Sequence, residues 1–207
     1  MGTFDRRMEI GATILLSVSA LGTSWAGYQA SLWNGSQIEL SYDAQAIRTR
    51  ATRATTKAGL QRTVDVALFT SWLEAYARHD TVYATFLERR FRREFIPAFD
   101  AWRATKPAHN PNAPLTPFVM PEYHLFADDS ALELDRLADN SGTLGVAANR
   151  HSDAYVLDAV LFATAMVFGG VAQQESNRKT TRLTLIGLAG LMCVFGLVRL
   201  VMSPAAL

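Results

Sequence analysis

Three stretches of this sequence are each apolar over roughly 20 residues, the length that an α-helix needs to cross the hydrocarbon core of a bilayer. They lie at about residues 10–30, 154–171 and 183–202. The last two are separated by AQQESNRKTTR, which is long enough only for a tight turn. The sequence therefore predicts an all-α membrane protein with three transmembrane helices, of which the last two form an antiparallel hairpin.

The long interval between the first and second spans is predicted to be a helical extramembrane domain. The predicted regions are residues 1–35 with the N-terminal segment and first span, 36–152 with the extramembrane domain, and 153–207 with the hairpin. Within the middle region, residues 106–121 contain five prolines, which exclude helix and central strand and predict a crossover loop.

Helices are predicted on both sides of this Pro-rich loop. One continues from the first span to Arg78, and a shorter one covers residues 81–95 and stops at Pro97. A third begins near Asp128 and continues into the second span. Residues that recur at three- and four-residue steps predict two narrow packing seams of the coiled-coil kind. The seams contain Ala44, Ile47, Ala51, Ala54 and Ala58, and Leu134, Leu137, Ser141, Leu144, Ala148, His151 and Tyr155.

Positive charges in the short segments predict the orientation, because such charges favour the cytoplasmic side. Arg6 and Arg7 precede the first span, and Arg178, Lys179 and Arg182 fill the hairpin turn. The N-terminus would then be cytoplasmic and residues 36–152 extracytoplasmic, in a multi-pass protein of the bacterial plasma (inner) membrane.

The first span has a second reading, as a cleaved signal peptide, because arginines precede it and SWA offers a small-residue cleavage site. Trp25, Tyr28 and Trp33 favour a retained helix, since aromatic residues of this kind form belts at the membrane interface.

In this layout the chain resembles a class of uncharacterised bacterial membrane proteins with an N-terminal span, a coiled extramembrane region and a C-terminal two-span hairpin. The resemblance lies in SWAGYQASLWNGSQ after the first span and in the closing hairpin. It covers the layout of the whole chain and implies the same architecture. The class has no assigned activity, so the resemblance implies no function.

Asp158 is the residue that most needs an explanation, because a charge inside an apolar span is costly unless it is paired or near water. Counted from the centre of the hairpin turn, Asp158 and Arg199 lie at equal distances along two antiparallel helices. The sequence therefore predicts an intramembrane Asp158–Arg199 ion pair. Two alternatives remain open, namely independent interfacial charges and a carboxylate that lines an ion pathway.

A face of small and hydroxyl residues follows the first span, and such faces allow helices to approach closely in lipid. It comprises Ser19, Gly22, Thr23, Ala26, Gly27 and Ala30. Packing within the subunit is the first interpretation, and an oligomer seam or pore wall is the alternative.

The segment LERRFRREF alternates cation pairs with phenylalanines, so it is a candidate contact for lipid headgroups or an acidic partner, against the alternative of a solvated helix face. Its arginines are Arg89, Arg90, Arg92 and Arg93. The four histidines lack metal-ligand spacing, and the single cysteine excludes an intrachain disulfide. No nucleophile elbow, P-loop or dinucleotide fingerprint occurs, and the net charge of +1 argues against nucleic-acid binding.

These features favour a non-enzymatic integral membrane protein without cofactor or metal. It would act as an oligomeric scaffold or as an accessory subunit of a larger membrane complex, with the bilayer and either copies of itself or another membrane protein as partners. An ion channel or ion-coupled transport component that uses Asp158 is the alternative. A second alternative is an extracytoplasmic sensor module.

Overall fold

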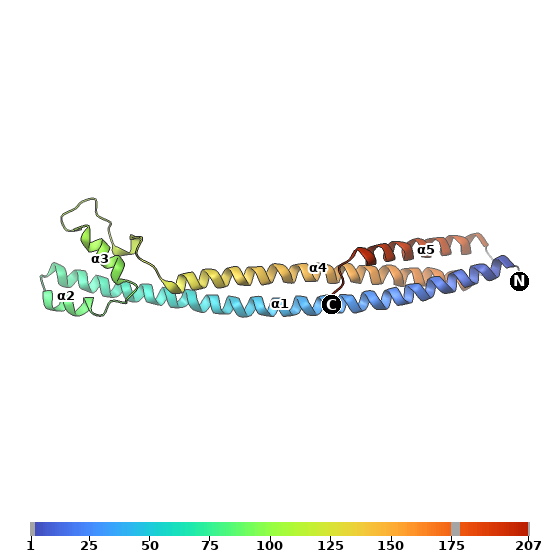
Figure 1. Ribbon diagram of the computed structural model, residues 1–207, viewed down its shortest axis with the longest axis horizontal. Coiled ribbons are helices and arrows are strands. Elements are labelled where there is room, and N and C mark those ends of the chain that lie inside the picture. The colour runs from blue at the N-terminus through green and yellow to red at the C-terminus, as the bar shows by residue number, and fades with distance from the viewer. Residues whose placement is uncertain (1–2, 175–178, 207) are drawn as a thin grey trace. The chain divides into compact units, whose positions relative to one another are not determined.

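The computed structural model describes residues 3–174 and 179–206, with side chains from Met8 onward. The side chains of Arg6 and Arg7, and all of Arg178, lie outside the described residues. These arginines are three of the five positive charges on which the predicted orientation rests. The elements are α1 (Thr3–Ala77), α2 (Thr81–Glu88), α3 (Ile96–Ala104), the 3-10 helix η1 (Pro117–Val119), α4 (Phe126–Gln174) and α5 (Lys179–Met202) (Figure 1).

The all-helical prediction is confirmed. Helices account for 84% of the chain, and no strand occurs among the described residues. Three helices, α1, α4 and α5, are long and apolar enough to cross a membrane. Their outward faces carry large apolar side chains, among them Leu21, Leu191 and Val201, which are 73%, 67% and 84% exposed.

The chain divides into two compact units, to both of which α1 and α4 contribute. Unit 1 comprises Met1–Ala44 and Asn140–Leu207, and unit 2 comprises Gln45–Asp139. The extramembrane domain predicted at residues 36–152 is thus longer at both ends than unit 2.

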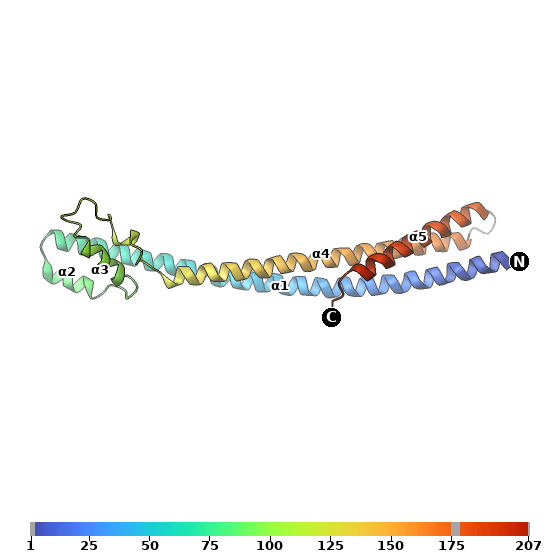
Figure 2. The same ribbon diagram turned by 45° about the horizontal axis from the view of Figure 1, so that its top comes forward.

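In unit 1 the N-terminal part of α1, the C-terminal part of α4 and the whole of α5 pack together, with α5 lying along α4 in both views (Figures 1 and 2). The interior is built from small residues and one large ring. Phe162 of α4 is fully buried between Gly22 of α1 and Gly196 of α5. Ala26, Ala165 and Ala189 are also fully buried, which is the close packing that associates helices in lipid.

Replacing Gly22 by alanine is expected to destabilise unit 1 by about 1–3 kcal/mol through overpacking. A Cβ atom at Gly22 would lie 2.8 Å from the Phe162 ring, and the backbone of α5 at Gly196 leaves the ring little room to retreat, since even a Cβ built there would be only 3.1 Å from it. Gly27→Ala is the matched control, since nothing lies within 4 Å of its Cβ position. Unfolding in mixed micelles measures the difference, and equal stability of the two variants would contradict this packing.

The seam predicted along α4 is wrong at two of its leucines, whereas its members Ala148 and Tyr155 are buried as predicted. Leu137 and Leu144 are 47% and 50% exposed, whereas Gly145, which the predicted seam did not include, is buried. A Cβ atom at Gly145 would lie 3.5 Å from the Leu40 side chain of α1. Because the helices approach this closely, small residues occupy the contact and the leucines turn outward.

Unit 2 holds an aromatic core that α1, α2, α3 and the segments after them build together. Its buried aromatic members are Phe69, Trp72, Phe91, Phe95, Phe99 and Trp102. Most neighbouring rings meet edge to face, as Phe69 and Trp102 do at 5.2 Å and 85°, the geometry that aromatic quadrupoles favour.

The helix predicted at residues 81–95 is wrong in its second half. α2 ends at Glu88, and residues 89–95 turn so that Phe91 and Phe95 enter the core. Pro97, predicted to stop a helix, lies in the first turn of α3. Proline is well suited to that position, because the first N–H groups of a helix have no intrahelical acceptor.

Candidate functional site

Asp158 of α4 and Arg199 of α5 lie in direct contact in unit 1. Arg199 Nε donates a hydrogen bond of 2.6 Å to Asp158 Oδ1. The aspartate side chain is fully buried, and its Oδ2 accepts no hydrogen bond from the described residues. The arginine side chain is 32% exposed. The two residues that hairpin geometry predicts as partners are therefore brought together.

The chain after α5 forms a latch, which we define as residues 203–206, and this latch is bound to both other helices of unit 1. Tyr155 of α4 and Trp33 of α1 donate hydrogen bonds to the Pro204 carbonyl, each at 3.1 Å. The fully buried Gln29 amide accepts from Ala206 N at 2.8 Å and donates to Ala206 O at 3.4 Å. The polar side chains of this region thus form hydrogen bonds with backbone groups of the same chain.

Gln29 and Ser152 make buried hydrogen bonds between segments that the sequence reasoning missed. Ser152 Oγ donates to the Ala30 carbonyl of α1 at 3.0 Å and so ties α4 to α1. A polar amide inside the first apolar stretch was the available signal for Gln29. Ser152 gave no comparable signal, because serine is common at interfaces of this kind.

The small-residue face of α1 is used mainly inside the subunit. Ser19, Gly22, Ala26 and Ala30 are buried, Thr23 is half-buried and Gly27 is exposed. Thr23 Oγ1 donates to the Ser19 carbonyl at 2.9 Å, and Ser19 Oγ has no partner among the described residues.

The three interfacial aromatics do not share one environment. Trp25 and Tyr28 are 48% and 56% exposed, with ring centroids 6.0 Å apart. Trp33 is half-buried, and its ring lies 4.6 Å from that of His151. Trp25 and Tyr28 thus form an exposed aromatic pair, whereas Trp33 belongs to the helix contact and to the latch.

A second charged centre lies in unit 2, where Asp65 of α1 is fully buried. Arg92 forks onto this carboxylate, with Nε donating to Oδ1 and Nη2 donating to Oδ2, both at 2.9 Å. Tyr123 donates to Oδ2 at 3.2 Å, and Arg92 also reaches Glu94 at 2.7 Å. The hydrogen bond to Asp65 is the largest cause that raises the pKa of Arg92, against the effect of burial.

The four arginines of LERRFRREF therefore have different roles. Arg92 turns inward to Asp65, whereas Arg89, Arg90 and Arg93 are exposed. The sequence reasoning grouped all four as candidate contacts and missed Asp65. An aspartate among Val64, Val66 and Leu68 was the only signal for its burial, and nothing local identified the partner.

Tyr123 makes the stability of unit 2 fall at alkaline pH. Burial raises its pKa from 10.0 to about 12, with the Asp65 charge and the hydrogen bond to Asp65 adding to this. Between these values the folded protein keeps a proton that the unfolded chain has released, so stability falls as pH rises from 10 to 12. We expect Tyr123→Phe to lose less stability across this window than the parent, as measured by denaturant unfolding with tyrosinate absorbance. Parallel loss in both proteins would contradict the assignment.

An apolar and cationic surface covers the outer side of α2, and we call it the α2 surface. It comprises Val82, Tyr83, Phe86, Arg89 and Arg90. Val82 is 81% exposed, and Tyr83 and Phe86 are each 47% exposed. The Arg90 guanidinium lies 3.4 Å from the centroid of the Phe86 ring, so cation and ring form one feature.

Comparisons with protein-family models, curated proteins and solved structures give no match. Among the described residues, no group of three or more His, Cys, Asp or Glu side chains could hold a metal ion.

Proposed function

We propose that this protein is a non-enzymatic accessory subunit of a larger membrane complex. Its three apolar helices insert in the bacterial inner membrane, and the region between the first two spans lies outside the cytoplasm. Unit 1 acts as the anchor, and the α2 surface of unit 2 contacts an acidic, apolar segment of a neighbouring membrane protein.

The use of the polar groups in unit 1 is the observation that carries the anchoring role. Asp158 binds Arg199, while Gln29, Trp33 and Tyr155 bind the backbone of the latch. The Asp158 side chain has no exposed surface. A carboxylate that passes ions would need contact with water, so this burial favours a structural pair over an ion-handling group.

The α2 surface supports the choice of partner. It joins a largely exposed valine and two aromatic rings to two exposed arginines, and aromatic residues with arginine are typical of the energetic centres of interfaces. Neither Arg89 nor Arg90 takes part in an ion pair among the described residues. The matching partner surface is therefore apolar with carboxylates.

Extraction of the native complex in lipid nanodiscs, followed by mass determination, tests the proposal. The parent protein should co-purify with one other membrane protein at fixed stoichiometry. Arg90→Glu should lose this partner, because the reversed charge repels an acidic surface. Arg53→Glu is the matched control, since Arg53 is also exposed and lies on α1 of the same unit.

Two outcomes would contradict the proposal. One is a protein without a stoichiometric partner in the native membrane. The other is a symmetric ring of this chain alone that conducts ions and loses conductance in Asp158→Asn while remaining assembled, which would establish the channel instead.

A further inference from the structure

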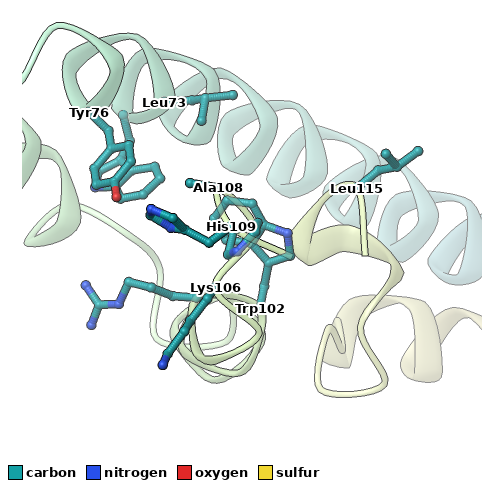
Figure 3. A pocket seen from close by; sticks show the side chains of 10 residues that line it. Leu73, Tyr76, Trp102, Lys106, Ala108, His109 and Leu115 are labelled. Atoms are coloured by element: carbon teal, nitrogen blue, oxygen red, sulfur yellow. The ribbon is translucent and has the colours of Figure 1, made fainter. Parts of the chain in front are cut away.

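A cavity of about 370 Å³ opens in unit 2 beside the aromatic core (Figure 3). We propose that it binds a small amphipathic carboxylate, an anion with an aromatic body. This inference goes beyond the accessory role and does not depend on it, since the cavity and the α2 surface share no residue.

The cavity is walled by aromatic rings in fixed positions. Trp72 of α1 and Trp102 of α3 are only 3% and 4% exposed. Trp72 Nε1 donates to Glu88 Oε1 and Trp102 Nε1 donates to the Pro114 carbonyl, both at 2.8 Å. Both indole N–H groups are therefore already bonded, and the apolar surface that a ligand would meet comes mainly from Leu73 and Tyr76, which are 44% and 53% exposed. The walls therefore select an apolar, flat group.

Charge determines the polar end of the ligand. Arg103, Lys106 and His109 line the cavity and no acidic side chain does. Arg103 is already paired with Glu88 and Asp100, at 3.3 and 3.4 Å. Lys106 makes no ion pair among the described residues. An unbalanced cation at the rim of an apolar cavity favours an anion, and one such charge matches a single carboxylate better than a polyphosphate.

The loop that carries Lys106 and His109 is held in place before any ligand binds. Lys106 has φ of 53°, in the left-handed region that is costly for a lysine. Backbone N–H groups of His109 and Asn110 donate to the Lys106 carbonyl at 2.9 and 3.1 Å, and the Asn110 side chain donates to Thr105 O at 3.1 Å. In Figure 3, His109 projects from this loop toward Tyr76 of α1, and Lys106 extends away from that helix. Such preorganisation reduces the ordering that binding would require.

Calorimetric titration of the full-length protein in nanodiscs tests the proposal, with indoleacetate and its neutral isostere indoleacetamide as probes. The carboxylate should bind about two- to fivefold more tightly than the amide, as for one exposed charge contact. Lys106→Asn should abolish this preference, and asparagine tolerates the left-handed backbone, so the loop is retained. Lys57→Asn removes an exposed charge from α1 of the same unit and should keep the preference.

A second variant tests the location. Ala108 lines the cavity, and Ala108→Phe should fill it and weaken both probes while leaving the aromatic near-UV spectrum of the core in place. Equal binding of carboxylate and amide to the parent would overturn the proposal. So would the absence of binding by either probe, or binding that Ala108→Phe leaves unchanged. Arg90→Glu, which disrupts the α2 surface, should leave the titration unaltered, so failure of the accessory role is distinguishable.

Discussion

Replacing Arg199 by methionine is expected to destabilise unit 1 by about 3–5 kcal/mol. The Asp158 carboxylate is fully buried, and Arg199 Nε is its one hydrogen-bond donor among the described residues. Removal of the guanidinium would leave a buried charge without compensation, and methionine approximates only the aliphatic part of the side chain. Equilibrium unfolding in mixed micelles, followed by circular dichroism, measures the loss.

Two further variants separate the charge effect from lost packing. The double change Asp158→Leu with Arg199→Met should regain most of the stability, because replacement of both members of a buried pair by apolar groups is often neutral or stabilising. Asp153→Asn is the matched control, since Asp153 lies on α4, as Asp158 does, but is exposed. If Arg199→Met unfolds no more easily than Asp153→Asn, the pair does not hold α4 and α5 together.

Arg92→Met is expected to cost unit 2 a similar amount, about 3–5 kcal/mol. Asp65 would keep only the hydrogen bond from Tyr123 at 3.2 Å while its side chain remains fully buried. Because the fork from Arg92 onto Asp65 joins the segment that follows α2 to α1, the change would release that segment from α1, and Glu94 would lose its bond to Arg92. Denaturant unfolding followed by near-UV circular dichroism reports this loss, since the surrounding core is aromatic.

The neighbouring arginine provides the control. Arg93 is exposed and makes no ion pair among the described residues, so Arg93→Met should change stability by no more than about 0.5 kcal/mol. Asp65→Leu combined with Arg92→Met should recover part of the loss. Equal effects of Arg92→Met and Arg93→Met would show that the fork onto Asp65 is not a stabilising contact.

Each unit thus has a buried carboxylate that is paired with an arginine from a different segment of the chain. In unit 1 the partner joins two helices of the anchor, and in unit 2 it joins α1 to the turn after α2. The sequence predicted the first of these two ion pairs but not the second. The difference lies in how regular the intervening structure is.

The Asp158–Arg199 contact could be predicted because two helices joined by a short turn rise equally on either side of it. Arithmetic along the chain then gives the depth of each residue. The Asp65–Arg92 contact could not be predicted in this way. The chain between them ends one helix, begins another and then makes turns at residues 89–95, so no constant rise links the two positions.

Packing seams were predicted less well than spans. The predicted seam along α4 included Leu137 and Leu144, because leucine at three- and four-residue spacing is typical of a helix interface. In the structure these two side chains are about half exposed and Gly145 is buried, whereas Ala148 and Tyr155 of the same seam are buried as predicted. Spacing fixes only which residues share a face, whereas the distance between two helices decides which face is buried.

The sequence by itself determined that the chain is helical, with three helices able to cross a membrane, because length and hydrophobicity are local properties of each segment. Only the tertiary structure decided how the latch binds Gln29, that Arg92 faces Asp65, and that Trp72 and Trp102 wall a cavity beside Lys106. Each of these contacts joins segments whose approach depends on turn geometry and side-chain packing. Neither is encoded by the periodicity of a single helix.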